Sequence, residues 1–150
     1  MTIAALKRSM CECPAFRISP NDTNYMAVVF DPQDEDCTAV AVVEIFDVGG
    51  RTPPNMHRRA TEFFFVLHGR GRARANGVWS ELLQGDALMV RPGAEHVIEN
   101  TGTERLYCLT MMVPDEHFSS IIRKGTPVQL DADDRRVISG LTAARAAAHA

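Results

Sequence analysis

The chain has 150 residues and a net charge of −3, with 45% hydrophobic and 23% charged residues, a balance typical of one globular domain. No run of about 18 apolar residues occurs, which excludes a membrane-spanning helix. The basic residues are dispersed, and the alternating Arg70, Arg72 and Arg74 are typical of a solvated strand face, which argues against nucleic-acid binding. No secretory signal is recognisable in residues 1–10, so we expect a cytoplasmic protein whose cysteines are free thiols.

The sequence divides into three expected parts. Residues 1–24 are expected to form an N-terminal extension, because the first apolar, β-prone run begins at Tyr25. Residues 25–114 are expected to form a barrel of short strands. Residues 115–150 change to a helical pattern and are expected to form a C-terminal helical segment.

The central part is rich in β-prone runs separated by turn signals. Asn76-Gly77 is the strongest hairpin signal in the chain, and Gly49-Gly50 and Pro53-Pro54 mark a loop. Many short strands with regular turns predict a sandwich or barrel. The predicted strands cover residues 25–30, 38–46, 61–67, 70–75, 78–83, 87–91, 95–99 and 105–113.

Two helices are predicted after the strands. The first covers residues 115–124 and is ended by Gly125. The second begins near Asp131, where acidic residues suit a helix N-terminus. Residues 143–150 are rich in alanine and are expected to extend this helix but to fray.

Two segments carry side chains that can bind a metal. Residues 49–62 contain Asn55, His57 and Glu62, and residues 85–100 contain His96. Residues two apart on a strand point to one face, so Asn55 and His57 are expected to point together. Glu62 can join them only if the chain turns within residues 58–61. His57 and Glu62 would then lie on adjacent strands, with His96 on a third.

These spacings resemble the two sequence motifs of the cupin superfamily. Asn55 replaces the first histidine of the first motif, and Arg91 replaces the proline of the second. The resemblance implies an all-β fold, a double-stranded β-helix or jelly-roll barrel, followed here by short C-terminal helices. The matching residues are Gly49, His57, Glu62 and Gly69 in the first motif and Gly85, Gly93, His96 and Asn100 in the second.

The resemblance also implies that His57, Glu62 and His96 are ligands of a divalent transition metal. Two histidines and one carboxylate form the ligand set of non-haem Fe(II) oxygenases, so Fe(II) is favoured. Manganese, nickel, cobalt and zinc suit the same donors, so the sequence does not select the metal.

Asn55 leaves three alternatives open. Its side-chain carbonyl could be a further, weak metal ligand. It could instead bind a metal-bound water and leave a coordination position open for substrate. Finally, the substitution could mark a protein whose metal affinity has decayed and whose pocket only binds a ligand.

Other residues are predicted to shape the pocket. Phe64 and Val66 share the parity of Glu62 and are expected to line the interior as substrate contacts. Phe63 and Phe65 are expected to face outward and to be buried against another layer or a second subunit, which favours a homodimer. Arg91 near the barrel mouth could clamp a substrate carboxylate or simply hold its turn.

The functional hypothesis that follows is a metal-dependent enzyme acting on a small organic molecule. The favoured reaction is that of an Fe(II) dioxygenase, and the other is Lewis-acid isomerisation or decarboxylation. The alternative is a non-catalytic module that binds a sugar or carboxylic acid at a weakened or lost metal site. No general base outside the metal site is assigned.

Overall fold

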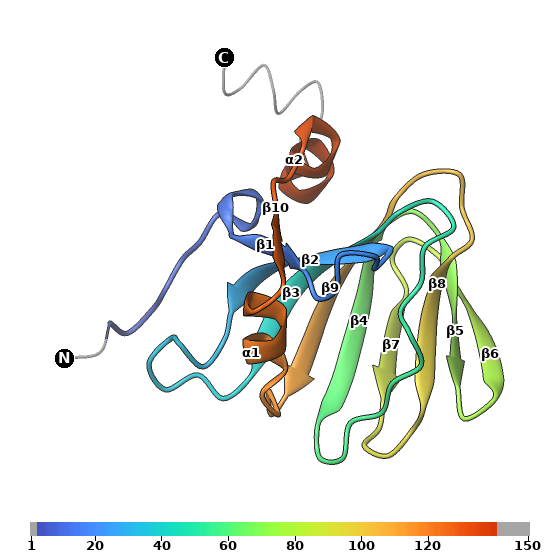
Figure 1. Cartoon of the computed structure of the whole chain (residues 1–150), viewed down its shortest axis with the longest axis horizontal. Helices are drawn as coiled ribbons and strands as arrows, with labels where there is room; N and C mark the ends of the chain where they lie inside the picture. Colours follow the sequence, from blue (N-terminus) through green and yellow to red (C-terminus); the bar gives the residue numbers. More distant parts are fainter. Residues whose placement is uncertain (1–2, 141–150) are drawn as a thin grey trace.

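The computed structural model describes residues 3–140, which form two antiparallel sheets flanked by two short helices (Figure 1). The alanine-rich extension predicted over residues 143–150 lies outside the described residues. The large sheet has seven strands in the order β10-β1-β2-β3-β9-β4-β7, and the small sheet has the order β6-β5-β8. The strands are β1 (Ala15–Arg17), β2 (Asn24–Phe30), β3 (Val40–Phe46), β4 (Thr61–His68), β5 (Gly71–Ala75), β6 (Val78–Leu82), β7 (Ala87–Val90), β8 (His96–Asn100), β9 (Leu106–Val113) and β10 (Thr126–Val128), with η1 (Met10–Glu12), α1 (Phe118–Arg123) and α2 (Ala132–Ser139) as helical elements.

The two sheets bury a shared hydrophobic core. Phe46 and Phe64 of the large sheet pack in one cluster with Ala73, Leu82 and Ile98 of the small sheet. This arrangement is a jelly-roll β-sandwich, which agrees with the sandwich or barrel predicted from the strand pattern and with the jelly roll implied by the motif resemblance. All eight predicted strands are present as β2 to β9.

Strand β4 confirms the predicted alternation of faces. Phe64 is 1% exposed and Val66 is 4% exposed in the core between the sheets, while Phe65 is 39% exposed on the opposite face. Glu62 has the parity of Phe64 and is therefore turned toward the interior.

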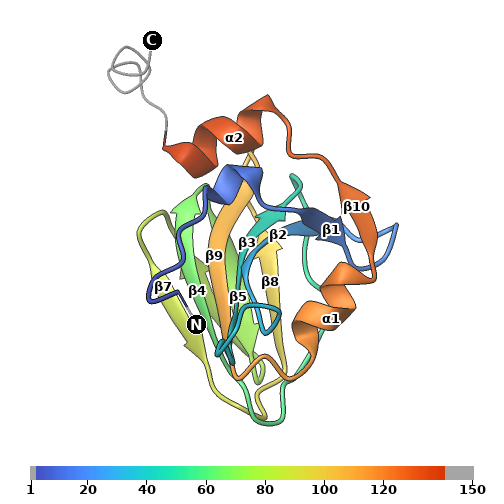
Figure 2. The ribbon, with the colours of Figure 1, turned by 90° about the vertical axis from the view of Figure 1, so that its left-hand side faces the viewer.

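Part of the outer face of the large sheet, over β2, β3 and β9, is covered by α2 and η1, which lie together at one end of the sheet (Figure 2). Tyr25, Val43 and Tyr107 of the sheet pack with Ile138 of α2 in a second core cluster. Because β2 and β3 are buried on both faces, they read as nearly continuous apolar runs. None of the described helices is long and apolar enough to cross a membrane.

The structure departs from the expected elements in two places. Strands β1 and β10 were not predicted; β1 pairs with both β2 and β10 and extends the large sheet. His57 does not lie on a strand, contrary to the expectation of adjacent strands for His57 and Glu62. It follows an isolated antiparallel bridge between Asn55 and His96, within the loop that joins β3 to β4.

Candidate metal centre

The structure brings His57, Glu62 and His96 together at one end of the space between the sheets. His57 comes from the β3–β4 loop, Glu62 from the start of β4, and His96 from the first position of β8. Glu62 Oε2 lies 2.7 Å from His96 Nε2 and 3.0 Å from His57 Nε2. One donor atom from each of the three residues lies within 4.8 Å of the others, so a single ion can contact all three.

Backbone pairing positions the two histidines. The Asn55 amide donates to the His96 carbonyl at 3.1 Å, and the His96 amide donates to the Asn55 carbonyl at 2.9 Å. The amide of Gly93 donates to the His57 carbonyl at 2.8 Å. The β3–β4 loop is therefore fixed to β8 and its preceding turn, and the imidazoles lie with their ring centroids 5.4 Å apart.

The protonation of the site follows from its burial and contacts. Burial of Glu62 disfavours its charge, but its contacts with His57 and His96 outweigh that effect and hold its pKa below the usual value. Burial likewise disfavours protonated His96, yet the contacts with Glu62 and the Ala94 carbonyl raise its pKa. Without a metal, the ion pair of Glu62 and His96 is the favoured state.

The donor atoms fit a metal ion. His96 Nδ1 lies 3.0 Å from the Ala94 carbonyl, and donation of that N–H leaves the Nε2 lone pair directed at the Glu62 side. His57 Nε2 is buried without a hydrogen-bond partner among the described residues, since its 3.0 Å approach to Glu62 is poorly aligned. A divalent cation between the three side chains would satisfy both imidazole nitrogens and the carboxylate.

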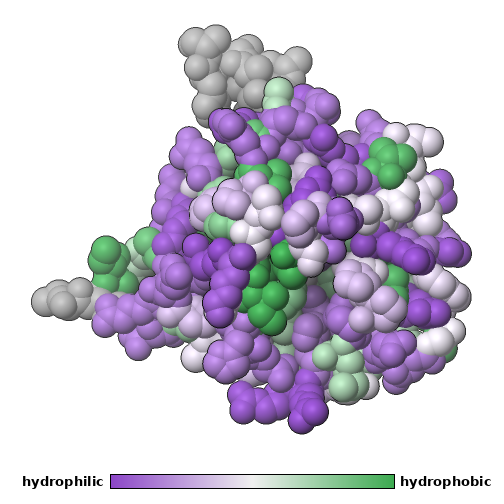
Figure 3. Space-filling view, in the orientation of Figure 1, coloured by the Kyte–Doolittle hydropathy of each residue, from purple (hydrophilic) through white to green (hydrophobic). Residues whose placement is uncertain are grey.

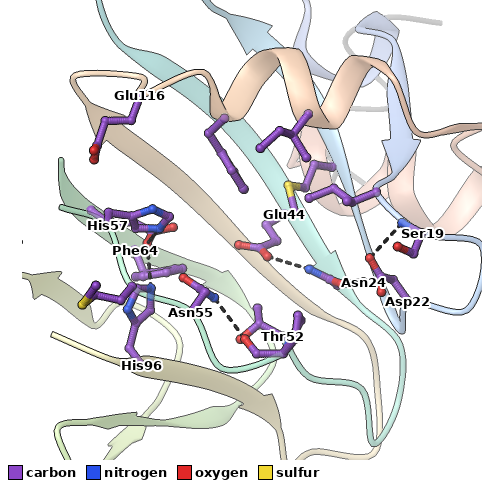
Figure 4. A pocket seen from close by; sticks show the side chains of 17 residues that line it. Ser19, Asp22, Asn24, Glu44, Thr52, Asn55, His57, Phe64, His96 and Glu116 are labelled. Carbon is purple, nitrogen blue, oxygen red and sulfur yellow. Dashed lines mark hydrogen bonds and ion pairs between the residues drawn. The ribbon is translucent and has the colours of Figure 1, made fainter. Parts of the chain in front are cut away.

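Asn55 lies beside this centre and lines the same cavity (Figure 4). Its Nδ2 donates to the Pro53 carbonyl at 3.0 Å, so the amide nitrogen is held by the loop. The carbonyl end, Oδ1, is the atom left for a metal, a metal-bound water or a ligand.

The candidate centre forms one wall of a cavity of about 380 Å³, within the usual range for small-molecule sites. Phe64 lines this cavity, as its interior parity predicts, and its role as a substrate contact stays a prediction. Val66 lies deeper in the core, and Arg91 is exposed on the turn before β8; neither belongs to the lining among the described residues. The other lining residues include Ile18, Ser19, Asp22, Asn24, Met26, Thr52, Met56, Glu116, Phe118 and Ile121.

Apolar side chains surround the cavity near α1. Met56 and Ile121 are about half exposed, at 50% and 51%, and Phe118 packs edge-on against His57 with 5.9 Å between ring centroids. Figure 3 shows an apolar patch near the centre of this face of the molecule, within a mostly polar surface. An apolar rim of this kind suits a ligand that is not wholly polar.

Glu44 is a cavity residue that the sequence interpretation missed. It lies on β3, is 3% exposed, and accepts hydrogen bonds from Asn24 Nδ2 at 2.8 Å and Thr110 Oγ1 at 3.1 Å. Burial, reinforced by the charge of Glu62, raises the pKa of Glu44 to about 7. The sequence did contain a signal, which is a carboxylate inside the apolar run of residues 40–46. Ionisable side chains are rarely buried unless they are paired or serve a function.

Comparisons with known proteins agree with this fold and these motifs. Residues 42–112 match the family model described as a cupin domain. An uncharacterized protein of Methanocaldococcus jannaschii is 31% identical over 70 residues, which are 47% of this chain and 56% of that protein. The aligned segment thus spans just over half the length of that relative.

Solved structures show the same architecture. A predicted oxalate decarboxylase from Thermotoga maritima superposes with a TM-score of 0.64 at 25% identity, covering 72% of this chain and 97% of that one. A cupin-2 domain from Rhodospirillum rubrum gives a TM-score of 0.57 at 19% identity, covering 85% of this chain and 78% of that one. The chain is a jelly-roll β-sandwich with a candidate His/Glu metal site. It contains a small cupin domain.

Proposed function

We propose that the protein is a metal-dependent enzyme that acts on a small organic molecule, with His57, Glu62 and His96 as metal ligands. The observation that supports this most is the convergence of the three donor atoms within 4.8 Å, including a buried His57 Nε2 without a hydrogen-bond partner. If the cluster were only structural, this imidazole nitrogen would be left unsatisfied. If His57 is a metal ligand, the same nitrogen is satisfied by the metal.

Two reactions are supported by different observations. The ligand set of two histidines and one carboxylate suits Fe(II) and a dioxygenase. The similarity to a predicted oxalate decarboxylase favours decarboxylation of a small carboxylic acid. A bound metal would supply either an oxygen-binding position or Lewis-acid polarisation of the substrate.

The residues of this chain supply the remaining requirements. Glu62 stays ionised because of its contacts with both histidines, so the donor set keeps its negative charge. Phe64 and Phe118 provide apolar walls that exclude water from the reacting end of the cavity. Asn55 adds an amide oxygen that orients a bound water or substrate beside the ligands.

Elemental analysis of tag-free protein tests this proposal. We expect about one equivalent of a divalent transition metal after loading with Fe(II) or Mn(II), and loss of most of it in His96→Ala. His68→Ala is the matched control, because it removes an imidazole outside the cavity lining. Less than about a tenth of an equivalent in the wild type, with no gain on loading, would overturn the proposal.

The second candidate function is a non-catalytic module that binds a sugar or carboxylic acid. The substitution at Asn55 favours it, because a lost imidazole weakens metal affinity, and disturbed metal-site partners alone lower affinity about 10–100-fold. A protein without metal that still binds small carboxylic acids would support this alternative over the enzyme.

We also propose that the protein is a homodimer. The outer face of β4 and its neighbours is apolar, with Phe65, Met89 and Val113 exposed by 39, 45 and 43%. Burial of such a face against a second copy would remove it from water. Sedimentation analysis of wild type and Phe65→Glu tests this, with a shift to monomer expected for the variant.

A further inference from the structure

Glu44 faces the candidate metal centre from the opposite side of the cavity. Figure 4 shows its carboxyl group directed into the cavity, with His57 and His96 on the other side and Asn24 beside it. Its two oxygens are each held by one donor, Asn24 on β2 and Thr110 on β9. The carboxyl group is therefore oriented by two strands of the large sheet.

The cavity favours the neutral form of Glu44. The lining holds no lysine or arginine among the described residues, so a bound divalent metal would be the cation that faces these carboxyl groups. Its two positive charges would be balanced by Glu62 and by the carboxylate of an acidic ligand, which leaves no charge to offset an ionised Glu44. The raised pKa of Glu44 agrees with this geometry. A neutral carboxyl group has an O–H donor as well as acceptor oxygens, and its oxygens already accept from Asn24 and Thr110. The O–H group is then available to a ligand in the cavity.

The surroundings of Glu44 define the kind of ligand. Met26, Phe64 and Phe118 line the same cavity and give it apolar walls. An acceptor oxygen is required opposite the neutral carboxyl group, and a metal-binding oxygen group is required at the centre. The absence of lysine and arginine from the described lining leaves the metal as the binding partner for an anionic group.

We propose that Glu44 is a substrate-binding residue that donates a hydrogen bond to a keto or hydroxyl oxygen of a small carboxylic acid whose carboxylate lies at the metal centre. The inference rests on the proposed function, because it assigns the carboxylate to the metal. It adds the substrate class: a carboxylic acid with a second oxygen function, separated from the carboxylate by a short apolar segment. Glu44 thereby selects between acids of equal length.

Binding of matched acids to Mn(II)-loaded protein, measured by calorimetry, tests this inference. The probes are hexanoate, 4-oxohexanoate and 5-oxohexanoate, which differ in a single keto oxygen and its position. We expect the wild type to prefer one oxo acid over hexanoate by about 5-fold, the effect of one neutral hydrogen bond. Glu44→Met should reduce that preference to below about 2-fold, while Glu44→Gln, which keeps an N–H donor, should retain it.

Two controls separate recognition from structural support. Tyr107→Phe removes one hydrogen bond on the outer face of the large sheet, from a residue outside the cavity lining, so it should lower stability and leave the preference unchanged. Metal content is measured on every sample, which tests the proposed function separately. If the wild type holds no metal, the proposed function fails. The calorimetric titration of the metal-free protein with the three acids then still decides whether Glu44 selects oxo acids. Equal binding of the three acids by the wild type, or an unchanged preference in Glu44→Met, would overturn the role of Glu44.

Discussion

Glu62 Oε2 lies 2.7 Å from His96 Nε2, and both side chains are almost completely buried. Buried ion pairs offset the cost of removing two charges from water only when their geometry is good and their remaining atoms are satisfied. Here the Ala94 carbonyl satisfies the other nitrogen of His96, whereas His57 Nε2 has no hydrogen-bond partner in the described chain. The cluster therefore gains most from a cation that replaces the proton between Glu62 and His96.

The metal-free and metal-loaded proteins should respond to pH in opposite directions. The pKa of His96 in the folded protein is raised above its ordinary value of 6.5. Protonated His96 therefore stabilises the fold fully below pH 6.5, and this stabilisation is lost as the pH rises through the folded pKa. Metal ligation requires neutral imidazole, so metal affinity rises over the same range. We expect urea unfolding to show falling stability of the metal-free protein above about pH 6.5 and rising stabilisation by Mn(II). A metal-free protein whose stability rises over this range would contradict the assignment.

Glu44→Gln should stabilise the metal-free protein at alkaline pH. The folded pKa of Glu44 is raised from 4.5 to about 7, so wild-type stability from this group is lost as pH rises between these values. Gln is neutral throughout and keeps an oxygen acceptor and the side-chain volume. The free energy of unfolding of Glu44→Gln minus that of the wild type should therefore be on the order of 3 kcal/mol larger above pH 7 than near pH 4. Urea unfolding at the two pH values gives this difference, and an equal effect of the variant at both would show that Glu44 ionises without penalty.

The sequence could predict the strands that contain long apolar runs and the residues that form the candidate metal site. Val40–Phe46 is buried along its whole length, and an apolar run that is interrupted by Glu44 alone signals such a strand directly. His57, Glu62 and His96 were found through motif spacing, and the fold brings their donor atoms together. Periodicity alone could not have joined segments 34 residues apart, as Glu62 and His96 are.

The features that were missed depend on tertiary context. Strands β1 and β10 have three residues each, and Pro127 lies in the middle of β10, so no local signal marks them. They are strands because each pairs with a neighbour. His57 was placed on a strand from parity, but the chain there forms only a single bridge at Asn55. The sequence predicts that Glu44 lies on a strand, but it does not show that the side chain lines the cavity, and its proposed role depends on that position.

Asn55→Ala should leave metal content within about 2-fold of wild type if Asn55 holds water or substrate rather than the metal. The Nδ2 atom is bound to the Pro53 carbonyl, so the substitution removes one hydrogen bond at a half-buried position. That bond accounts for a stability loss of about 1 kcal/mol. Elemental analysis beside His57→Ala decides the question, because a loss of metal equal to that of His57→Ala would show that Asn55 is a direct ligand.

Asp134→Ala should destabilise the fold strongly without altering metal content. Asp134 is 1% exposed at the first turn of α2 and accepts hydrogen bonds from Tyr25 at 2.9 Å, Tyr107 at 2.8 Å and Arg105 at 3.1 Å. Its own backbone amide donates to Asp131, which begins the helix as a capping box.

Removal of the Asp134 carboxylate leaves the buried hydroxyl groups of Tyr25 and Tyr107 without their acceptor, while Arg105 keeps its ion pair with Asp131. We therefore expect a loss of about 3–5 kcal/mol in urea unfolding. Tyr107→Phe, which removes a single donor, should cost only about 1 kcal/mol and serves as the control. The candidate metal centre involves none of these residues, so metal content per folded molecule should stay at the wild-type value. A variant that retained wild-type stability would show that α2 is not held to the sheet by this carboxylate, while a folded variant without metal would show that the outer face of the sheet supports the site.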